Sequence, residues 1–100
     1  MKFVVLLEDH PGVGADIRKQ YMSQHLKFLD EHSEHIDAAG PLVNLKGDGA
    51  GGIWIVEAAT GSEVTGLVEK DPFWPTGLRK SVRILHWNQV YANGKALITP

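Results

Sequence analysis

Apolar residues follow one another without interruption in two short segments of the chain. Every residue from Phe3 to Leu7 is apolar, and residues 53–58 are nearly as rich in Ile, Val and Trp. Side chains alternate between the two faces of a β-strand, so a continuous apolar run is typical of a strand that is covered on both faces. We therefore predict two central strands, one at residues 2–8 and one at residues 53–58.

Residues 15–36 repeat their apolar side chains with the 3.6-residue period of an α-helix, and polar side chains fill the opposite half of the helical wheel. Three polar residues interrupt the apolar face at intervals of seven: Arg18, His25 and His32. His25 lies near the middle of the face, where a buried imidazole is costly unless it has a polar partner. We expect His25 to have such a partner, either as a hydrogen-bonded core residue or as part of a functional site.

A hairpin is predicted after this helix. Residues 39–43 form a short strand, and the glycine-rich segment 46–52 connects it to the strand at residues 53–58. This connector lacks the Lys-Ser/Thr pair of a phosphate-binding P-loop and does not lead into a helix, so we do not expect it to bind phosphate.

A second, shorter helix follows, with Ser62 as its expected N-cap. Pro72 ends this helix, because proline disfavours helical geometry at the residue before it. Residues 81–91 are rich in Val, Ile, Trp and Tyr and predict a last strand. Residues 92–100 are weakly patterned and are expected to be a frayed end or an extra short strand.

The predicted order is β-α-β-β-α-β, which is that of a ferredoxin-like α+β domain with an antiparallel sheet. A chain of 100 residues is long enough for one such domain and too short for two. The two helices cover one face of the sheet, yet the central strands are apolar on both. A second copy of the chain is the simplest cover for the other face, so we expect a homodimer.

Composition narrows the classes of function. The chain has no cysteine, which excludes disulfides, thiolate metal sites and cysteine nucleophiles. The net charge of −2 argues against a nucleic-acid partner, which usually requires a basic surface. No segment has the length of a transmembrane span, and the apolar start lacks a signal-peptide cleavage site, so we expect no membrane partner and a cytoplasmic location.

The five histidines invite a metal-site interpretation, because His32 and His35 have helical i, i+3 spacing. However, no carboxylate completes an obvious ligand set around them, and we expect no metal.

Asp71 is the second candidate functional residue. An Asp before a proline is commonly a turn residue, but Phe73 and Trp74 follow closely and would exclude water from the carboxylate. A carboxylate beside a histidine fixes the tautomer of the ring and stabilises its protonated form, which prepares the imidazole for acid/base catalysis.

Four sequence elements together resemble the YCII-related domain family over roughly residues 1–90. They are His25-Leu26 in the first helix, Ala39-Gly40-Pro41-Leu42 at the second strand, Asp71-Pro72-Phe73 after the second helix, and Gly77-Leu78. The resemblance implies a dimeric α+β barrel in which two sheets pack face to face. It also implies a catalytic dyad of His25 and Asp71. The residues that we expect to bind the substrate around this dyad are Arg18, His32, Gly40, Pro41, Phe73 and Trp74.

The resemblance does not fix a substrate. One relative removes chloride from a hydroxylated aromatic ring, and the wider superfamily includes muconolactone isomerases and cofactor-free oxygenases. Two hypotheses follow: a cofactor-independent enzyme that isomerises a small cyclic or aromatic substrate or eliminates a group from it, or a non-catalytic dimeric module that binds a small ligand.

Overall fold

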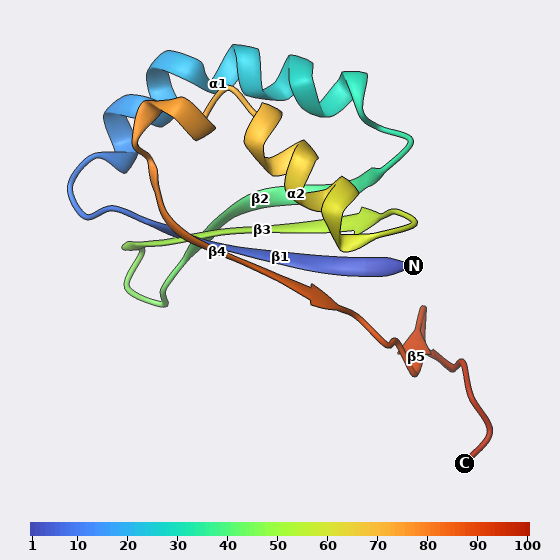
Figure 1. Cartoon of the computed structure of the whole chain (residues 1–100). Helices are drawn as coiled ribbons and strands as arrows, with labels where there is room; N and C mark the ends of the chain where they lie inside the picture. Colours follow the sequence, from blue (N-terminus) through green and yellow to red (C-terminus); the bar gives the residue numbers. More distant parts are fainter.

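The computed structural model describes all 100 residues, and its centre is a four-stranded antiparallel sheet that carries both long helices on one face (Figure 1). The strand order is β2-β3-β1-β4, so the first and third strands are central, as predicted. The β-α-β-β-α-β order of a ferredoxin-like α+β domain is therefore confirmed. The elements are β1 (Lys2–Asp9), α1 (Gly14–Glu31), β2 (Ile36–Val43), β3 (Gly49–Glu57), α2 (Gly61–Lys70) and β4 (Arg79–His86).

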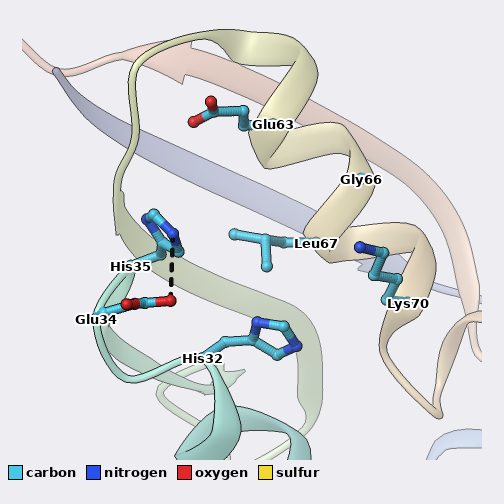
Figure 2. Close-up of a pocket in the computed structure, with 7 residues that line it drawn as sticks. All are labelled: His32, Glu34, His35, Glu63, Gly66, Leu67 and Lys70. Carbon is cyan, nitrogen blue, oxygen red and sulfur yellow. Dashed lines mark ion pairs between the residues drawn. The ribbon is translucent and has the colours of Figure 1, made fainter.

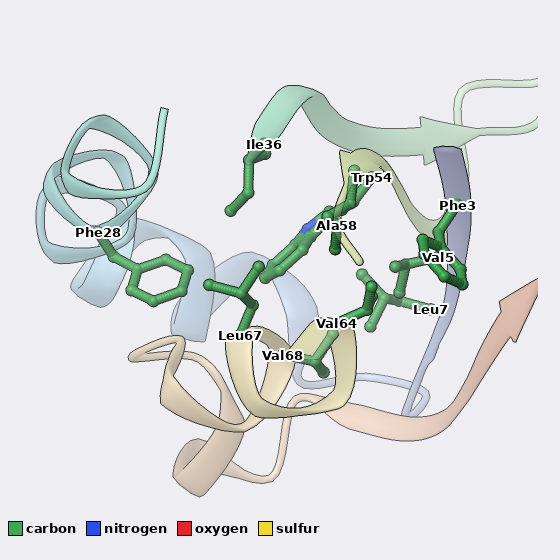
Figure 3. Close-up of a cluster of buried hydrophobic side chains, with 11 residues drawn as sticks. Phe3, Val5, Leu7, Phe28, Ile36, Trp54, Ala58, Val64, Leu67 and Val68 are labelled. Carbon is green, nitrogen blue, oxygen red and sulfur yellow. The ribbon is translucent and has the colours of Figure 1, made fainter. Parts of the chain in front are cut away.

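The hydrophobic core fills the space between the sheet and the helices (Figure 3). Alternate residues of β1 and β3 point into it, because the pleat sends every second side chain to the same face. Trp54 is its largest fully covered side chain. The buried members are Phe3, Val5, Leu7, Phe28, Ile36, Trp54, Val56, Ala58, Val64, Leu67 and Val68.

The opposite face of the sheet carries the other half of the apolar residues. Val4 lies beside Ile55 in the sheet, and Leu6 lies beside Ile53, in the middle of this face. Neither helix covers it (Figure 1), and these four side chains are half-buried in a single chain. Both central strands are thus apolar on two faces, of which this chain covers one.

The first helix is shorter than predicted, since it ends at Glu31 rather than at residue 36. His32 leaves helical geometry with φ −116° and ψ 25°, and a turn of polar residues follows. Ile36, which also fits the helical stripe, instead begins β2, where it pairs with Val56 and is buried in the core. Helical periodicity could not reveal this boundary, because a strand that starts at the core also begins with an apolar residue.

The N-cap of α2 is Thr60, and the expectation of Ser62 was wrong. Thr60 is extended, with φ −141° and ψ 157°, and its hydroxyl accepts a hydrogen bond from the Glu63 backbone N–H at 3.2 Å. The Glu63 carboxylate reaches back to the Ala59 N–H at 3.0 Å. This reciprocal arrangement satisfies free donors at the helix start and resembles a capping box.

The last long strand, predicted at residues 81–91, is β4 at residues 79–86. Its last residue, His86, lies opposite Phe3 of β1 in the register. The tail then forms a small separate hairpin of β5 (Tyr91–Ala92) and β6 (Lys95–Ala96), which lies away from the main sheet (Figure 1). No helix is both long enough and apolar enough to cross a membrane.

Gly51 is the one glycine whose replacement the backbone forbids. Its φ is +91°, and a Cβ atom there would lie 1.9 Å from the Leu7 carbonyl oxygen on the neighbouring strand. Both features exclude any other residue unless β1 and β3 move apart. The close approach of the two central strands therefore depends on glycine at this position.

We expect Gly51→Ala to lower the free energy of unfolding by about 2–4 kcal/mol, because the added methyl group meets backbone rather than a mobile side chain. Gly49→Ala is the matched control, since a Cβ there meets open space, and should cost no more than about 0.5 kcal/mol. Urea unfolding of the two variants measures both values. Equal destabilisation by the two substitutions would contradict the close approach.

Candidate active site

Asp71 is held in place by the end of α2. The helix stops at Lys70, and Asp71 is extended with φ −62° and ψ 132°, as the proline that follows requires. Its carboxylate oxygen Oδ1 accepts a hydrogen bond from the Phe73 backbone N–H at 3.1 Å. The carboxylate is only 3% exposed, so a local backbone turn fixes a buried acceptor at this point.

His25 projects from α1 towards this carboxylate. Its Nδ1 lies 2.8 Å from Asp71 Oδ1, and its side chain is 8% exposed. Because an ionised carboxylate can only accept, Nδ1 carries the proton and donates it. The predicted partner of His25 is therefore Asp71, and the pair is buried.

The second ring nitrogen of His25 is free. Nε2 makes no hydrogen bond within the chain, although no fully buried side-chain nitrogen or oxygen lacks a partner. Nε2 therefore keeps some accessible surface, and His25 is one of the residues that line a cavity beside α1. A neutral His25 with its proton on Nδ1 presents an unshared electron pair to whatever enters that cavity.

Aromatic rings hold the imidazole on its other side. The Phe73 ring stacks on His25 with centroids 4.4 Å apart and planes at 28°, and Phe73 is fully buried. The Trp54 ring lies 6.3 Å from the imidazole. These rings exclude water, which strengthens the hydrogen bond to Asp71 and keeps the imidazole in one orientation.

The cavity beside His25 has a volume of about 80 Å³ and lies between α1 and the strands β2 and β3. Three of the six residues expected to bind substrate line it: Arg18, Gly40 and Pro41. Phe73 supports the imidazole from behind. The full lining is Arg18, Met22, His25, Leu26, Leu29, Ala39, Gly40, Pro41, Trp54 and Arg79.

The structure does not bring the other two predicted residues to this cavity. His32 lies at the end of α1, seven residues or about 10 Å beyond His25, and packs against the Phe28 ring. Trp74 begins the short 3₁₀ helix η1 (Trp74–Thr76) and is 41% exposed.

His32 instead lines a wider, open hollow of about 380 Å³ between the end of α1 and α2 (Figure 2). There Glu34 and His35 form an ion pair at 3.7 Å, marked in the figure, and Glu63 and Lys70 face them from α2. His35 Nδ1 is already bonded to the Glu57 carbonyl oxygen at 3.0 Å. No three His, Asp or Glu side chains in the chain converge closely enough to hold a metal ion.

Two charged residues of the site escaped the sequence analysis: Asp9 and Arg79. Asp9 Oδ1 accepts from Arg79 Nη1 and Oδ2 accepts from Arg18 Nη2, each at 2.8 Å. The register between β1 and β4 shifts at Glu8 and Asp9, so Asp9 pairs with Arg79 and Lys80 is skipped. This bulge turns Arg79 towards the helices, and no pattern in the sequence predicts the bulge.

The Arg79 side chain is only 5% exposed. Burial lowers the pKa of its guanidinium from the usual value, although the hydrogen bond with Asp9 acts in the opposite direction. A cation that is this deeply buried needs compensation from its surroundings.

The model of the YCII-related domain family matches residues 1–88. Among solved structures, a similar one is 5-chloro-2-hydroxyhydroquinone dehydrochlorinase from Burkholderia phenoliruptrix AC1100, determined in complex with 2,5-dihydroxybenzoquinone. It is 29% identical in sequence, with a TM-score of 0.77, and the match covers 88% of this chain and 94% of the other.

A hypothetical protein of Arabidopsis thaliana, solved in solution, shares the fold with a TM-score of 0.52. It is 14% identical, and the match covers 92% of this chain and 89% of the other. No curated protein sequence matches the chain significantly.

The 2.8 Å contact predicts the tautomer of His25. In the neutral ring the proton should reside on Nδ1, and nitrogen-15 chemical shifts of the ring measure this directly. We expect Asp71→Asn to move the proton towards Nε2, because the amide lacks the charge that holds it on Nδ1. Asp16→Asn, on the exposed start of α1, is the control and should change nothing. The same His25 tautomer in wild type and Asp71→Asn would contradict the assignment.

Proposed function

The chain belongs to the YCII-related domain family, and we propose that it is an enzyme that isomerises a small cyclic or aromatic organic substrate or eliminates a group from it. His25 and Asp71 move the proton, and no cofactor takes part. One observation carries the proposal: a buried imidazole that lines a cavity is bonded to a carboxylate through Nδ1, and its Nε2 has no partner within the chain. This is the arrangement that general acid/base catalysis requires.

The chemistry assigned to the dyad uses only these two side chains. Nε2 of His25 takes the proton of a substrate hydroxyl, and the oxygen's electron pair forms a carbonyl as the ring electrons shift. In an elimination, the imidazolium first returns this proton to the ring carbon that carries the leaving group. Nε2 then takes the proton of a second hydroxyl, and the leaving group departs with its bonding electrons as a second carbonyl forms. In an isomerisation, the imidazolium returns the proton at another position. Asp71 balances the transient charge on the ring, so neither metal nor redox group is needed to balance either reaction.

A structural neighbour supports this class of reaction. The dehydrochlorinase from Burkholderia phenoliruptrix has a matching fold over most of both chains, and by its name it eliminates hydrogen chloride from a chlorinated hydroxyhydroquinone. The present cavity combines apolar walls with polar groups at one side, as sites for small cyclic compounds do. We therefore propose hydroxylated rings as the substrate class.

The size of the cavity bears on how such a ring binds. At about 80 Å³ it is smaller than the ~150 Å³ cavity that is known to enclose benzene. Leu26, which lines it, is 53% exposed on the outer side of α1 and has room to move. We propose that a ring enters with one oxygenated edge beside His25 and extends outward past Leu26.

The exposed sheet face is the basis of a second proposal, that the protein works as a homodimer. The residues Val4, Leu6, Ile53 and Ile55 form a continuous apolar strip across the two central strands. A second copy packed on the same strip would bury it on both protomers, as a symmetric dimer interface does. The family's dimeric barrel is built in this way, which agrees with the proposal.

Removal of the imidazole should abolish turnover. With 5-chloro-2-hydroxyhydroquinone as test substrate and chloride release as the measurement, we expect His25→Ala to lower kcat about 10²–10⁴-fold. His32→Ala is the matched control, since it removes a histidine that lies outside the cavity, and should leave kcat unchanged. Full activity of His25→Ala would contradict the proposal. Wild-type protein that binds hydroxylated rings but turns none of them over would favour a ligand-binding module instead.

Light scattering tests the dimer. We expect wild type to have twice the 11.0 kDa mass of one chain at micromolar concentration, and Ile55→Glu to be monomeric, because it places a charge in the apolar strip. Leu45→Glu, at a fully exposed loop position, is the control and should remain dimeric. A monomeric wild type would overturn this proposal.

A further inference from the structure

Two arginines from distant parts of the chain meet beside the dyad. Arg18 comes from α1 and Arg79 from the start of β4, and the two oxygens of Asp9 each hold one of them at 2.8 Å. Arg18 Nη2 also lies 3.4 Å from the Gly51 carbonyl oxygen. Both guanidiniums are therefore fixed in position.

The three cationic or basic groups of the site surround one aromatic ring. The guanidinium carbons of Arg18 and Arg79 lie 5.7 Å and 5.5 Å from the centre of the Phe73 ring, and His25 stacks on it. Contact with the aromatic ring contributes to holding each guanidinium. Phe73 thus places both arginines close to the imidazole.

The basic and acidic side chains of the site occupy different positions relative to the cavity. Arg18, Arg79 and His25 line the cavity, whereas the carboxylates Asp9 and Asp71 bond to them and do not line it. A ligand in the cavity therefore meets donors and positive charge, with the negative groups behind. Asp9 is the carboxylate that bonds both arginines, whereas Asp71, whose charge also acts on Arg79, is bonded to His25.

Arg79 is nearly inaccessible, and burial lowers the pKa of its guanidinium even in the presence of Asp9. An anion in the cavity would offset the free-energy cost of burying the Arg79 guanidinium, because its charge would lie against both guanidiniums in a site of low polarity.

We infer that Arg18 and Arg79 form an anion subsite that holds an ionised oxygen of the substrate, a phenolate, an enolate or a carboxylate, beside His25. The inference rests on the proposed function and gives it a substrate class: planar compounds that bind as anions. In the proposed reaction a hydroxyl loses its proton to Nε2, and guanidiniums placed against that oxygen stabilise the charge that develops on it.

The experiment compares one anionic ring with one neutral ring. The hydroxyls of 2,5-dihydroxybenzoquinone are vinylogous acids and are ionised at neutral pH, whereas hydroquinone is a phenol and stays neutral. Titration calorimetry with the full-length chain measures the affinity for each. We expect wild type to bind the dihydroxybenzoquinone anion at least tenfold more tightly than hydroquinone, and the preference to weaken as salt is added.

Arg18→Gln is the informative variant, because Arg18 is the more exposed arginine and its loss leaves the Asp9–Arg79 pair in place. We expect it to weaken binding of the anion at least tenfold and to change hydroquinone binding less than twofold. Lys19→Gln, which removes the same charge from the adjacent exposed position, should alter neither. A thermal melt of each variant shows that the fold is retained.

Three results would overturn the inference: no binding of the anion by wild type at millimolar concentration, equal affinity of wild type and Arg18→Gln for the anion, or an equal loss in Lys19→Gln. Should Arg18→Gln fail to fold, Arg18→Lys gives the same comparison, because it keeps a charge but loses the planar fork. We expect Arg18→Lys to bind the anion less tightly than wild type does, but more tightly than wild type binds hydroquinone. An affinity of Arg18→Lys for the anion equal to that of wild type would also contradict the inference.

Binding and turnover are separate readouts. An arginine-dependent anion affinity without turnover of any ring supports the subsite and contradicts the catalytic proposal. Turnover that depends on His25 while anion affinity is independent of Arg18 supports the catalytic proposal and contradicts the subsite.

Discussion

A buried carboxylate and a buried imidazole each need a polar partner, because each is costly to bury alone. Asp71 and His25 satisfy this constraint with one hydrogen bond of 2.8 Å. The bond joins α1 to the end of α2, two elements that are 46 residues apart at this point. It also fixes the tautomer of the ring, so that Nε2 is left for the cavity. Both the packing of the helices and the proposed chemistry depend on this contact.

The rest of the site is arranged around the same point. The turn at Pro72 brings the Phe73 backbone N–H to the Asp71 carboxylate. The Phe73 ring contacts the imidazole and both guanidiniums. The glycine at position 51 lets β3 approach β1 closely where Arg18 reaches its carbonyl oxygen. One short segment after α2 thus contacts His25 and both arginines that line the cavity.

Much of this was accessible from the sequence. The uninterrupted apolar runs and the 3.6-residue period predicted the element order, and the polar residue at the centre of the helical stripe predicted a partner for His25. The segment Asp71-Pro72-Phe73 predicted the end of the second helix, because proline disfavours helical geometry at Asp71, and the family resemblance that it carries implied that Asp71 is that partner. These signals are local, and local backbone preferences decide them.

The features that escaped prediction depend on contacts between distant strands. Ile36 fits the helical stripe but pairs with Val56 in the sheet, and periodicity cannot distinguish the two. The pairing of Asp9 with Arg79 results from a one-residue shift in register, which decides that Arg79 rather than Lys80 faces the helices. His32 has the same seven-residue spacing as Arg18 and His25, yet α1 ends before it.

A crystal structure of the protein with 2,5-dihydroxybenzoquinone tests the central claim most directly. The account predicts a ligand oxygen within hydrogen-bond reach of His25 Nε2, about 2.6–3.2 Å away, while Nδ1 remains bonded to Asp71. A ligand that binds elsewhere, for example in the hollow beside His32 and Lys70, or a His25 whose Nε2 faces Asp71, would contradict it.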